Sequence, residues 1–498
     1  MPHRTATALA ALVNSCLLPA YAGRTPADWI LRAADEGLAG VALFGTNLLD
    51  ARGPLREDIT DRLRAVRPDL LIALDEEGGD VTRLDYLTGS AYPGNHALGT
   101  VDDPELTTLV AAAIAADLAA AGVNLCLAPC ADVNSRPDNP IIGVRSFGAE
   151  PALVARHTAA FVAGLQRHGI AATLKHFPGH GDTRTDSHTA LPDVDRDRDQ
   201  LAALDLPPFA AGIAAGAKLV MTGHIRLPRI DQLPATFSHS VLTGLLREEL
   251  GFDGVIVTDA LDMAPIVDRW GFGGAAAAAL AAGADLVLLG SPDAEKLLPE
   301  IHHEVELALR EGRLTEQRLA EAAARVAALR VWARPAATPP RPDPAVGLAA
   351  ARRALTAYGL TPPGAPRTVH TVRLGATANL AVGEAPWGPA GPLAALGALA
   401  GSTEVEPGTD PAEIPLPGGP LVVAVRDAHR DPWQRDTLRA LRARRPDLVT
   451  VEFGLAAQDP APDGPTLLTR GAGLANATAA AEYLSGRSWQ GPLRSGRA

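Results

Sequence analysis

The chain has 498 residues, which is more than one hydrophobic core usually supports, so we expect at least two domains. Hydrophobic residues make up 47% of the sequence and charged residues 20%, a composition typical of a globular protein with an ample core. The formal net charge of −12 and the lack of a basic cluster argue against nucleic acid or an anionic membrane as a partner.

The N-terminal stretch MPHRTATALAALVNSCLLPAYAG has the arginine, the apolar run and the small-residue end of a secretion signal. Asn14 and Ser15 interrupt the apolar run, and the stretch supplies a strand that the fold below requires, so we interpret it as part of the folded protein. The three cysteines form no C-x-x-C pair, which favours buried thiols and predicts a cytoplasmic protein. The sequence contains no run of about eighteen apolar residues, so we expect no membrane span.

Eight short apolar runs come before residue 300, and each predicts a buried strand: SCLLPAY near 15, GVALFG at 40, LLIALDEEGG at 70, VNLCLAPCADVN at 123, AATLKHF at 171, AKLVMTGHI at 217, GVIVTDALDM at 254 and ADLVLLG at 284. Helical patterns separate these runs, as expected for parallel strands joined by crossover helices. The alternation predicts an α/β protein with a (β/α)8 TIM-like barrel.

A proline-rich segment, RPAATPPRPDP, follows the last helical pattern of this region and is typical of an interdomain linker. Beyond it, short apolar runs again alternate with a helical pattern, which predicts a smaller α/β sandwich domain. We therefore predict a catalytic barrel domain over residues 1–333, a linker over 334–345 and a C-terminal domain over 346–498.

Six polar residues stand at or just past the ends of the predicted strands: Asp75, Asp132, Lys175, His176, His224 and Asp259. In a barrel of this kind the carboxyl ends of the strands form the face that carries the active site. Independent caps and turns would explain one or two of these residues but not six at equivalent positions. This face is therefore the candidate active site.

The segment KHFPGHGDTRTDSHTALP, residues 175–192, holds three histidines and one of only 3 lysines in the chain. A compact ammonium suits a small polar ligand that is held at one point. Pro178 and the two glycines that follow it predict a loop with few apolar anchors, which we expect to move.

Asp186 and His188 lie two residues apart in this loop, where the carboxylate would fix the tautomer of the ring and raise its basicity. Such a pair serves as a general acid/base, although a purely structural pair is the commoner explanation when it is considered alone. Asp259 is the candidate nucleophile, because attack of a carboxylate on carbon beside a separate proton donor is the logic of retaining glycoside hydrolysis. Asp262 is its rival, but its place in a loop or first helical turn favours a cap.

Five segments resemble, in order and spacing, the motifs of family 3 glycoside hydrolases, specifically the β-N-acetylglucosaminidase branch: DEEGGDVTRL, NPIIGVRSFG, KHFPGHGDTRTDSH, MTGHI and GFDGVIVTDALDM. The resemblance covers roughly residues 10–330. It implies a barrel enzyme that removes terminal β-linked N-acetylglucosamine through a covalent glycosyl-enzyme intermediate. We expect no cofactor and no metal, and a small carbohydrate as the ligand.

By this resemblance Asp259 is the nucleophile, and His188 is the acid/base held by Asp186 on a mobile loop. Lys175 would donate to a sugar hydroxyl with His176 as its partner. The full set of positions implied to contact sugar hydroxyls and subsites is Asp75, Arg145, Lys175 and His176, with His224 a neighbour. Other branches of the family take a glutamate acid/base from the second domain, which the Asp–His pair makes unnecessary here.

The leading hypothesis is a retaining exo-β-N-acetylglucosaminidase that acts on muropeptides or chitin fragments. A phosphorylase is the alternative, because a neutral imidazole does not repel phosphate as a carboxylate would. A metal-dependent barrel hydrolase would use His176, His180 and His188, although Pro178 makes a helical H-x-x-x-H site unfavourable. A non-catalytic binding protein is disfavoured, because the candidate nucleophile and the Asp–His pair occur together.

Overall fold

The computed structural model describes residues 6–48, 56–185, 190–334, 341, 343–376, 381–383, 385–456, 463–487 and 494–495. Two compact units interleave in the sequence. The first comprises Met1–Glu76, Thr107–Ile142 and Ala149–Pro342, and the second comprises Glu77–Leu106, Gly143–Gly148 and Asp343–Ala498. The predicted linker at 334–345 lies mostly outside the described residues, and the predicted domain limits stay a prediction.

Among the described residues, the first unit contains one parallel strand in each of the eight apolar runs: β1 (Leu17–Pro19), β2 (Gly40–Leu43), β3 (Leu71–Leu74), β4 (Leu125–Cys126), β5 (Ala171–Phe177), β6 (Leu219–Thr222), β7 (Val255–Val257) and β8 (Val287–Leu289). Strands β2 to β7 pair in chain order, β1 pairs with β8, and a bridge between Val257 and Leu286 joins β7 to β8. The curled parallel sheet confirms the predicted barrel.

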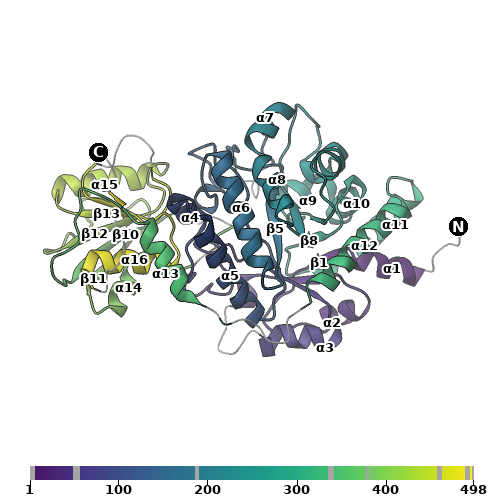
Figure 1. The fold of residues 1–498 in the computed structure, drawn as a ribbon, viewed down its shortest axis with the longest axis horizontal. Coiled ribbons are helices and arrows are strands. Elements are labelled where there is room, and N and C mark those ends of the chain that lie inside the picture. The colour runs from purple at the N-terminus through teal and green to yellow at the C-terminus, as the bar shows by residue number, and fades with distance from the viewer. Residues whose placement is uncertain are drawn as a thin grey trace. The chain divides into compact units, whose positions relative to one another are not determined.

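Helices accompany these strands as predicted (Figure 1). They are α1 (Ala6–Asn14), α2 (Asp28–Asp35), α3 (Asp61–Val66), α5 (Pro104–Ala120), α6 (Pro151–Gln166), α7 (Arg198–Leu204), α8 (Pro207–Ala214), α9 (Ala264–Trp270), α10 (Phe272–Ala282), α11 (Ala294–Arg310) and α12 (Glu316–Trp332), with the π-helical segments η2 (Arg56–Thr60) and η5 (Ser240–Glu249) and the 3-10 turns η1 (Gly45–Asn47) and η4 (Ala235–Phe237). None of the helices in the described ranges is long and apolar enough to cross a bilayer.

The strands form a continuous aliphatic core. Its buried members include Leu18, Ala42, Leu71, Ala73, Leu125, Ala171, Leu219, Met221, Val255, Val257, Leu286 and Leu288. Since a packed barrel interior leaves no room for polar groups, the polar residues that end the strands lie at the rim.

The second unit is a mixed sheet with the spatial order β11-β10-β12-β13-β14-β9-β15. Its strands are β9 (Thr356–Tyr358), β10 (Val369–Leu374), β11 (Leu399–Val405), β12 (Leu421–Val425), β13 (Val449–Glu452), β14 (Thr466–Leu468) and β15 (Arg494–Ser495), and its helices are α4 (Asn95–Val101), α13 (Pro344–Ala354), α14 (Ala390–Ala395), α15 (Pro432–Arg444) and α16 (Leu474–Ser485), with the turn η3 (Gly143–Arg145). The predicted second α/β domain is confirmed.

The order in which successive strands are added to this sheet reverses at β10. Strand β11 pairs with one edge of β10 and β12 with the other, and β11, β10, β12, β13 and β14 are all parallel. In open α/β sheets the carboxyl ends of the strands at such a reversal form a crevice in which ligands bind.

A fully buried carboxylate organises one end of the barrel. Asp285 lies two residues before β8 and accepts hydrogen bonds from Arg247, Arg318 and Arg325 and from the Ile256 backbone N–H, the last at 3.0 Å. Burial lowers the pKa of Arg247 to about 10, and the charge of Asp285 opposes that shift. The cluster ties η5 and α12 to the barrel strands.

We predict that Asp285→Ala lowers the free energy of unfolding by about 3–5 kcal/mol, because it leaves neighbouring guanidinium groups without their buried partner. Asp195→Ala is the control, since it removes an ion pair with Arg229 in which the Asp195 side chain is 79% exposed, and such pairs contribute less than about 1 kcal/mol. Urea denaturation of both variants measures the difference. Similar losses would contradict a structural role for the cluster.

Candidate active site

An ion pair joins two strand ends at the rim of the barrel. Lys175 lies on β5, and Asp75 directly follows β3. The Lys175 Nζ and the Asp75 Oδ1 are 2.7 Å apart, and the lysine side chain is only 3% exposed. The pair holds a cation and an anion side by side, which suits the donors and acceptors of sugar hydroxyl groups.

A second buried carboxylate holds His176. Asp132 accepts a hydrogen bond from the His176 Nδ1 at 2.8 Å, from the His176 and His180 backbone N–H groups, and from the Cys130 thiol at 3.2 Å. Burial would raise the pKa of Asp132, but the two histidines lower it well below its ordinary range. Because Nδ1 must carry a proton to donate to a carboxylate, Nε2 is the nitrogen that His176 can offer to a ligand.

The first part of the predicted mobile loop is tightly packed. Burial lowers the pKa of His180 to about 4, so its ring is neutral, and its Nδ1 lies 2.8 Å from the Thr183 Oγ1. A Cβ on Gly181 would lie 1.7 Å from the Val133 carbonyl oxygen, so only glycine fits there. The prediction that little packing holds this loop is therefore wrong for residues 178–183. Close backbone contacts hold these residues in place, although apolar side chains are few.

Asp259 stands two residues past β7 in a turn that is held from both sides. Its Oδ1 accepts the Ala260 N–H at 2.8 Å, and its own N–H donates to the Thr222 carbonyl at the end of β6. The His224 Nε2 donates to the Ala260 carbonyl at 3.0 Å, and its Nδ1 lies 2.8 Å from the Thr236 Oγ1. The geometry gives His224 a supporting place beside the candidate nucleophile, and its predicted contact with substrate stays a prediction.

The rival carboxylate has a different environment. The Asp262 Oδ1 accepts the Gly290 backbone N–H at 2.6 Å, just past the end of β8. Burial raises the pKa of Asp262. The predicted helix cap is wrong, because Met263 precedes α9 and no side-chain cap bond forms there. Asp262 instead joins the segment after β7 to the end of β8.

The remaining predicted residues belong to the second unit or lie outside the described ranges. Arg145 ends the turn η3 in the second unit and forms a two-bonded ion pair with Glu77, with Nε to Oε2 at 3.0 Å and Nη2 to Oε1 at 2.8 Å. Both side chains are buried. Asp186 and His188 are not among the described residues, so the acid/base pair stays a prediction.

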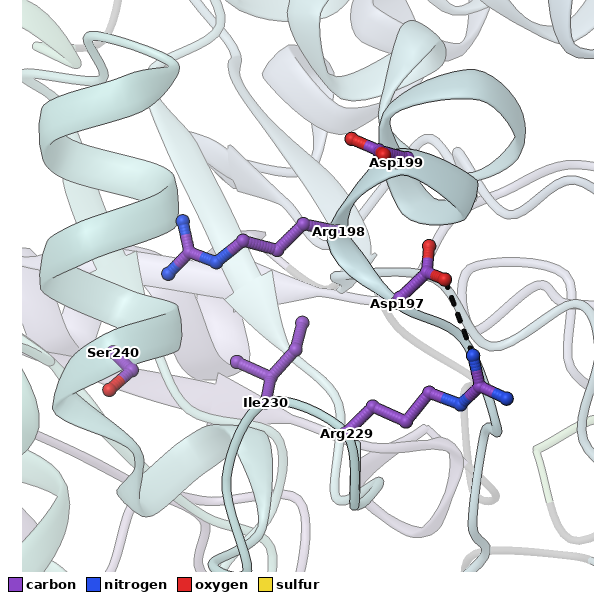
Figure 2. A pocket seen from close by; sticks show the side chains of 6 residues that line it. All are labelled: Asp197, Arg198, Asp199, Arg229, Ile230 and Ser240. Carbon is purple, nitrogen blue, oxygen red and sulfur yellow. Dashed lines mark hydrogen bonds and ion pairs between the residues drawn. The ribbon is translucent and has the colours of Figure 1, made fainter.

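A cavity of about 430 Å³ opens near the start of α7, and its lining residues include none of the predicted residues that the structure describes (Figure 2). It is lined by Asp197, Arg198, Asp199, Arg229, Ile230 and Ser240. Arg229 is ion-paired with Asp195 and Asp197, and Arg198 with Glu249. These arginines are already neutralised by the protein, so the cavity is not the candidate active site.

One group of described residues has the composition and spacing of a metal site. Possible ligand atoms of Cys130, Asp132 and His176 lie within 4.8 Å of one another. The thiol and the imidazole Nδ1 both donate to the Asp132 Oδ2, so a metal would have to displace both protons. The hydrogen bonds explain the group without a metal.

Sequence reasoning noted Asp132 only as a strand-end residue and missed Glu77 and Thr236. The signal for Glu77 was the third acidic residue of the DEEGG segment, which has no role in an apolar strand. Thr236 carried no local signal, because it meets His224 only through the fold of the loop after β6.

Comparison with known proteins supports this assignment of the site to a glycosidase barrel. The chain is 40% identical over 283 residues to beta-hexosaminidase A of Pseudoalteromonas piscicida, a match that covers 52% of this chain and 47% of that protein. It is 38% identical over 291 residues to a beta-hexosaminidase of Stenotrophomonas maltophilia (strain K279a), covering 56% of this chain and 82% of that protein. The chain thus matches less than half of the length of the first relative and most of the second.

A solved structure matches nearly the whole chain. The glycoside hydrolase family 3 beta-N-acetylglucosaminidase from Paenibacillus sp. str. FPU-7 superposes with a TM-score of 0.83 at 31% identity, and the match covers 98% of both chains. The profile of the glycosyl hydrolase family 3 N terminal domain matches residues 27–329, which is more than half of the sequence. The resemblance inferred from the motifs is confirmed, and the chain belongs to glycosyl hydrolase family 3.

Proposed function

We propose that the protein is a retaining exo-β-N-acetylglucosaminidase that hydrolyses terminal β-linked N-acetylglucosamine. The observation that carries the proposal is the Asp259 carboxylate, held by the Ala260 N–H just past the end of β7. It belongs to the same barrel rim as the Asp75–Lys175 pair and His176, at the ends of β3 and β5. The similarity to hexosaminidases and to a β-N-acetylglucosaminidase structure supports the substrate class.

In the first step, Asp259 attacks the anomeric carbon and forms an ester bond to it while the glycosidic C–O bond breaks. The leaving oxygen takes a proton from His188, which becomes neutral. In the second step, neutral His188 accepts a proton from water, the water oxygen bonds to the anomeric carbon, and Asp259 leaves as a carboxylate. Asp186 orients the ring and stabilises its protonated form.

We assign substrate binding to the other predicted site residues. Asp75 accepts hydrogen bonds from sugar hydroxyls, Lys175 donates to them, and His176 presents its Nε2 to them. Asp132 acts through His176, because it fixes the ring and leaves Nε2 as the outward nitrogen. Arg145 is the remaining substrate contact, assigned from the family motif in which it stands.

Two further assignments concern the acceptor of the sugar and the natural substrate. Water is the proposed acceptor, with phosphate as the alternative, and muropeptides or chitin fragments are the proposed substrates. Assay of an aryl N-acetyl-β-glucosaminide and the matching glucoside, each with and without phosphate, tests the acceptor and the sugar specificity. It does not test the natural glycan. Release of free N-acetylglucosamine at the same rate in both buffers supports hydrolysis, and the appearance of the sugar 1-phosphate would establish phosphorolysis instead. Faster cleavage of the glucoside would contradict the substrate class.

We predict that Asp259→Asn lowers kcat by about 10⁴-fold or more, because it removes the nucleophile and leaves the fold intact. Asp262→Asn is the matched control, since it changes the neighbouring carboxylate that binds the Gly290 N–H. The control should lose thermal stability and keep most of its turnover. An Asp259→Asn protein with near wild-type turnover, checked for deamidation by mass spectrometry, would refute the assignment.

We predict that His188→Ala slows cleavage of natural disaccharides far more than that of activated aryl glycosides, because a stable phenolate leaves without a proton. The glycosyl-enzyme should accumulate with activated substrates, and mass spectrometry of the intact protein detects it. Asp186→Ala should show both effects in milder form, since the ring remains but loses its orienting carboxylate. A merely structural histidine would instead slow both classes of substrate by a similar factor.

A further inference from the structure

A buried carboxylate lies beside the carboxyl ends of β12 and β14 in the second sheet. Asp80 is buried there, and its Oδ1 accepts the Ala472 N–H at 2.6 Å while its Oδ2 accepts from the Arg426 Nη2 at 2.5 Å. Arg426 directly follows β12, and Ala472 lies four residues past β14.

The segment that carries Asp80 is a tight turn. The Glu77 N–H donates to the Val81 carbonyl at 3.0 Å, and the Gly79 N–H donates to the Tyr92 carbonyl at 2.7 Å. Gly79 has φ +60°, and a Cβ there would lie 2.5 Å from Gly94, so the turn tolerates only glycine at this position. Its backbone is thus confined, and a displacement of Asp80 must move Glu77.

Glu77, at the base of this turn, holds the guanidinium of Arg145 through two hydrogen bonds. The main chain of Arg145 is held separately, because the Asn95 Nδ2 donates to its carbonyl at 2.7 Å. Glu77 therefore contributes to the direction of the Arg145 side chain. All of these contacts lie within the second unit.

We infer that Arg426 is a positioning residue for substrate binding, acting through Asp80 and the turn 77–81 on the Glu77–Arg145 pair. The inference rests on the proposed function, which assigns Arg145 to the substrate. It gives the C-terminal domain a role in the reaction although that domain supplies no predicted catalytic group. A single guanidinium at the end of β12 sets the direction of a second guanidinium that lies far from it in the sequence.

The packing around the link makes it stiff. A Cβ on Gly473 would lie 3.0 Å from Gly79, so the two backbones are in contact. The cavity beside the Asp80–Arg426 pair is about 10 Å³, no larger than a single water molecule. Burial raises the pKa of Asp80 and Arg426 opposes that rise, so loss of Arg426 favours a neutral carboxyl that holds the turn less firmly.

The test compares Arg426→Gln with Arg352→Gln in the full-length protein. Arg352 forms a two-bonded ion pair with Glu482 in the same unit, at 2.7 and 2.6 Å, and this pair involves no residue of the turn 77–81. We expect kcat/KM for an aryl N-acetyl-β-glucosaminide to fall about 10-fold in Arg426→Gln, because small displacements of a binding group are costly. Arg352→Gln should lose comparable thermal stability with less than about a 2-fold change in kcat/KM.

A double-mutant cycle separates positioning from a general loss of structure. If Arg426 acts through Arg145, then Arg145→Ala/Arg426→Gln should be no slower than Arg145→Ala alone. Independent, multiplied losses would overturn the inference. Arg426→Lys keeps the charge but not the planar guanidinium, and it should recover part of the lost kcat/KM. It also serves as the test variant if the glutamine variant does not fold.

Hydrogen exchange gives a readout that does not depend on activity. The backbone amides of residues 77–81 should exchange faster in Arg426→Gln than in wild type and should be unchanged in Arg352→Gln. Unchanged exchange in both variants would overturn the inference. A wild-type protein that does not cleave the aryl glycoside would refute the proposed function, and the exchange measurement would still decide the link between Arg426 and the turn. Normal cleavage with equal kcat/KM in the two variants would refute the inference alone.

Discussion

The rim of the barrel depends on one carboxylate that does not reach solvent. Asp132 receives hydrogen bonds from the segment after β4, from β5 and from the loop after β5. A buried charge is tolerated only when donors surround it, so these three segments are held in the arrangement that satisfies it. The direction of the His176 ring and the packing of residues 178–183 both follow from this requirement.

An acidic partner accompanies three of the side chains that are assigned to the substrate. Lys175 has Asp75, His176 has Asp132, and Arg145 has Glu77. In each pair the acidic partner limits the rotation of the donor, so the donor's direction is set before a ligand arrives. A sugar presents many uncharged polar groups, each of which binds weakly. A site for such a ligand gains more affinity from donors and acceptors held in fixed directions than from additional charge.

Local sequence patterns were sufficient for the strands, because burial and the turns between strands act over a few residues. They also placed Asp75, Lys175, His176 and Asp259 at strand ends. The pairing of these residues depends on the closed sheet, and the partners lie 100 residues apart for Lys175 and Asp75 and 44 for His176 and Asp132. Gly181 was interpreted as a source of mobility, whereas the structure uses it for contact with the Val133 carbonyl. No local pattern indicates that residues 77–106 pack with the C-terminal sheet.

The interleaving of the two units has a consequence for the order of events during synthesis. The turn at Asp80 leaves the ribosome long before its partners, since Arg426 follows it by 346 residues and Ala472 by 392. Contacts at such sequence separations form late. Asp80, in the segment between β3 and α5, therefore lacks these two partners while the rest of the barrel is synthesised. The C-terminal sheet, although it is translated after the barrel, is therefore the part that completes the loop after the third barrel strand.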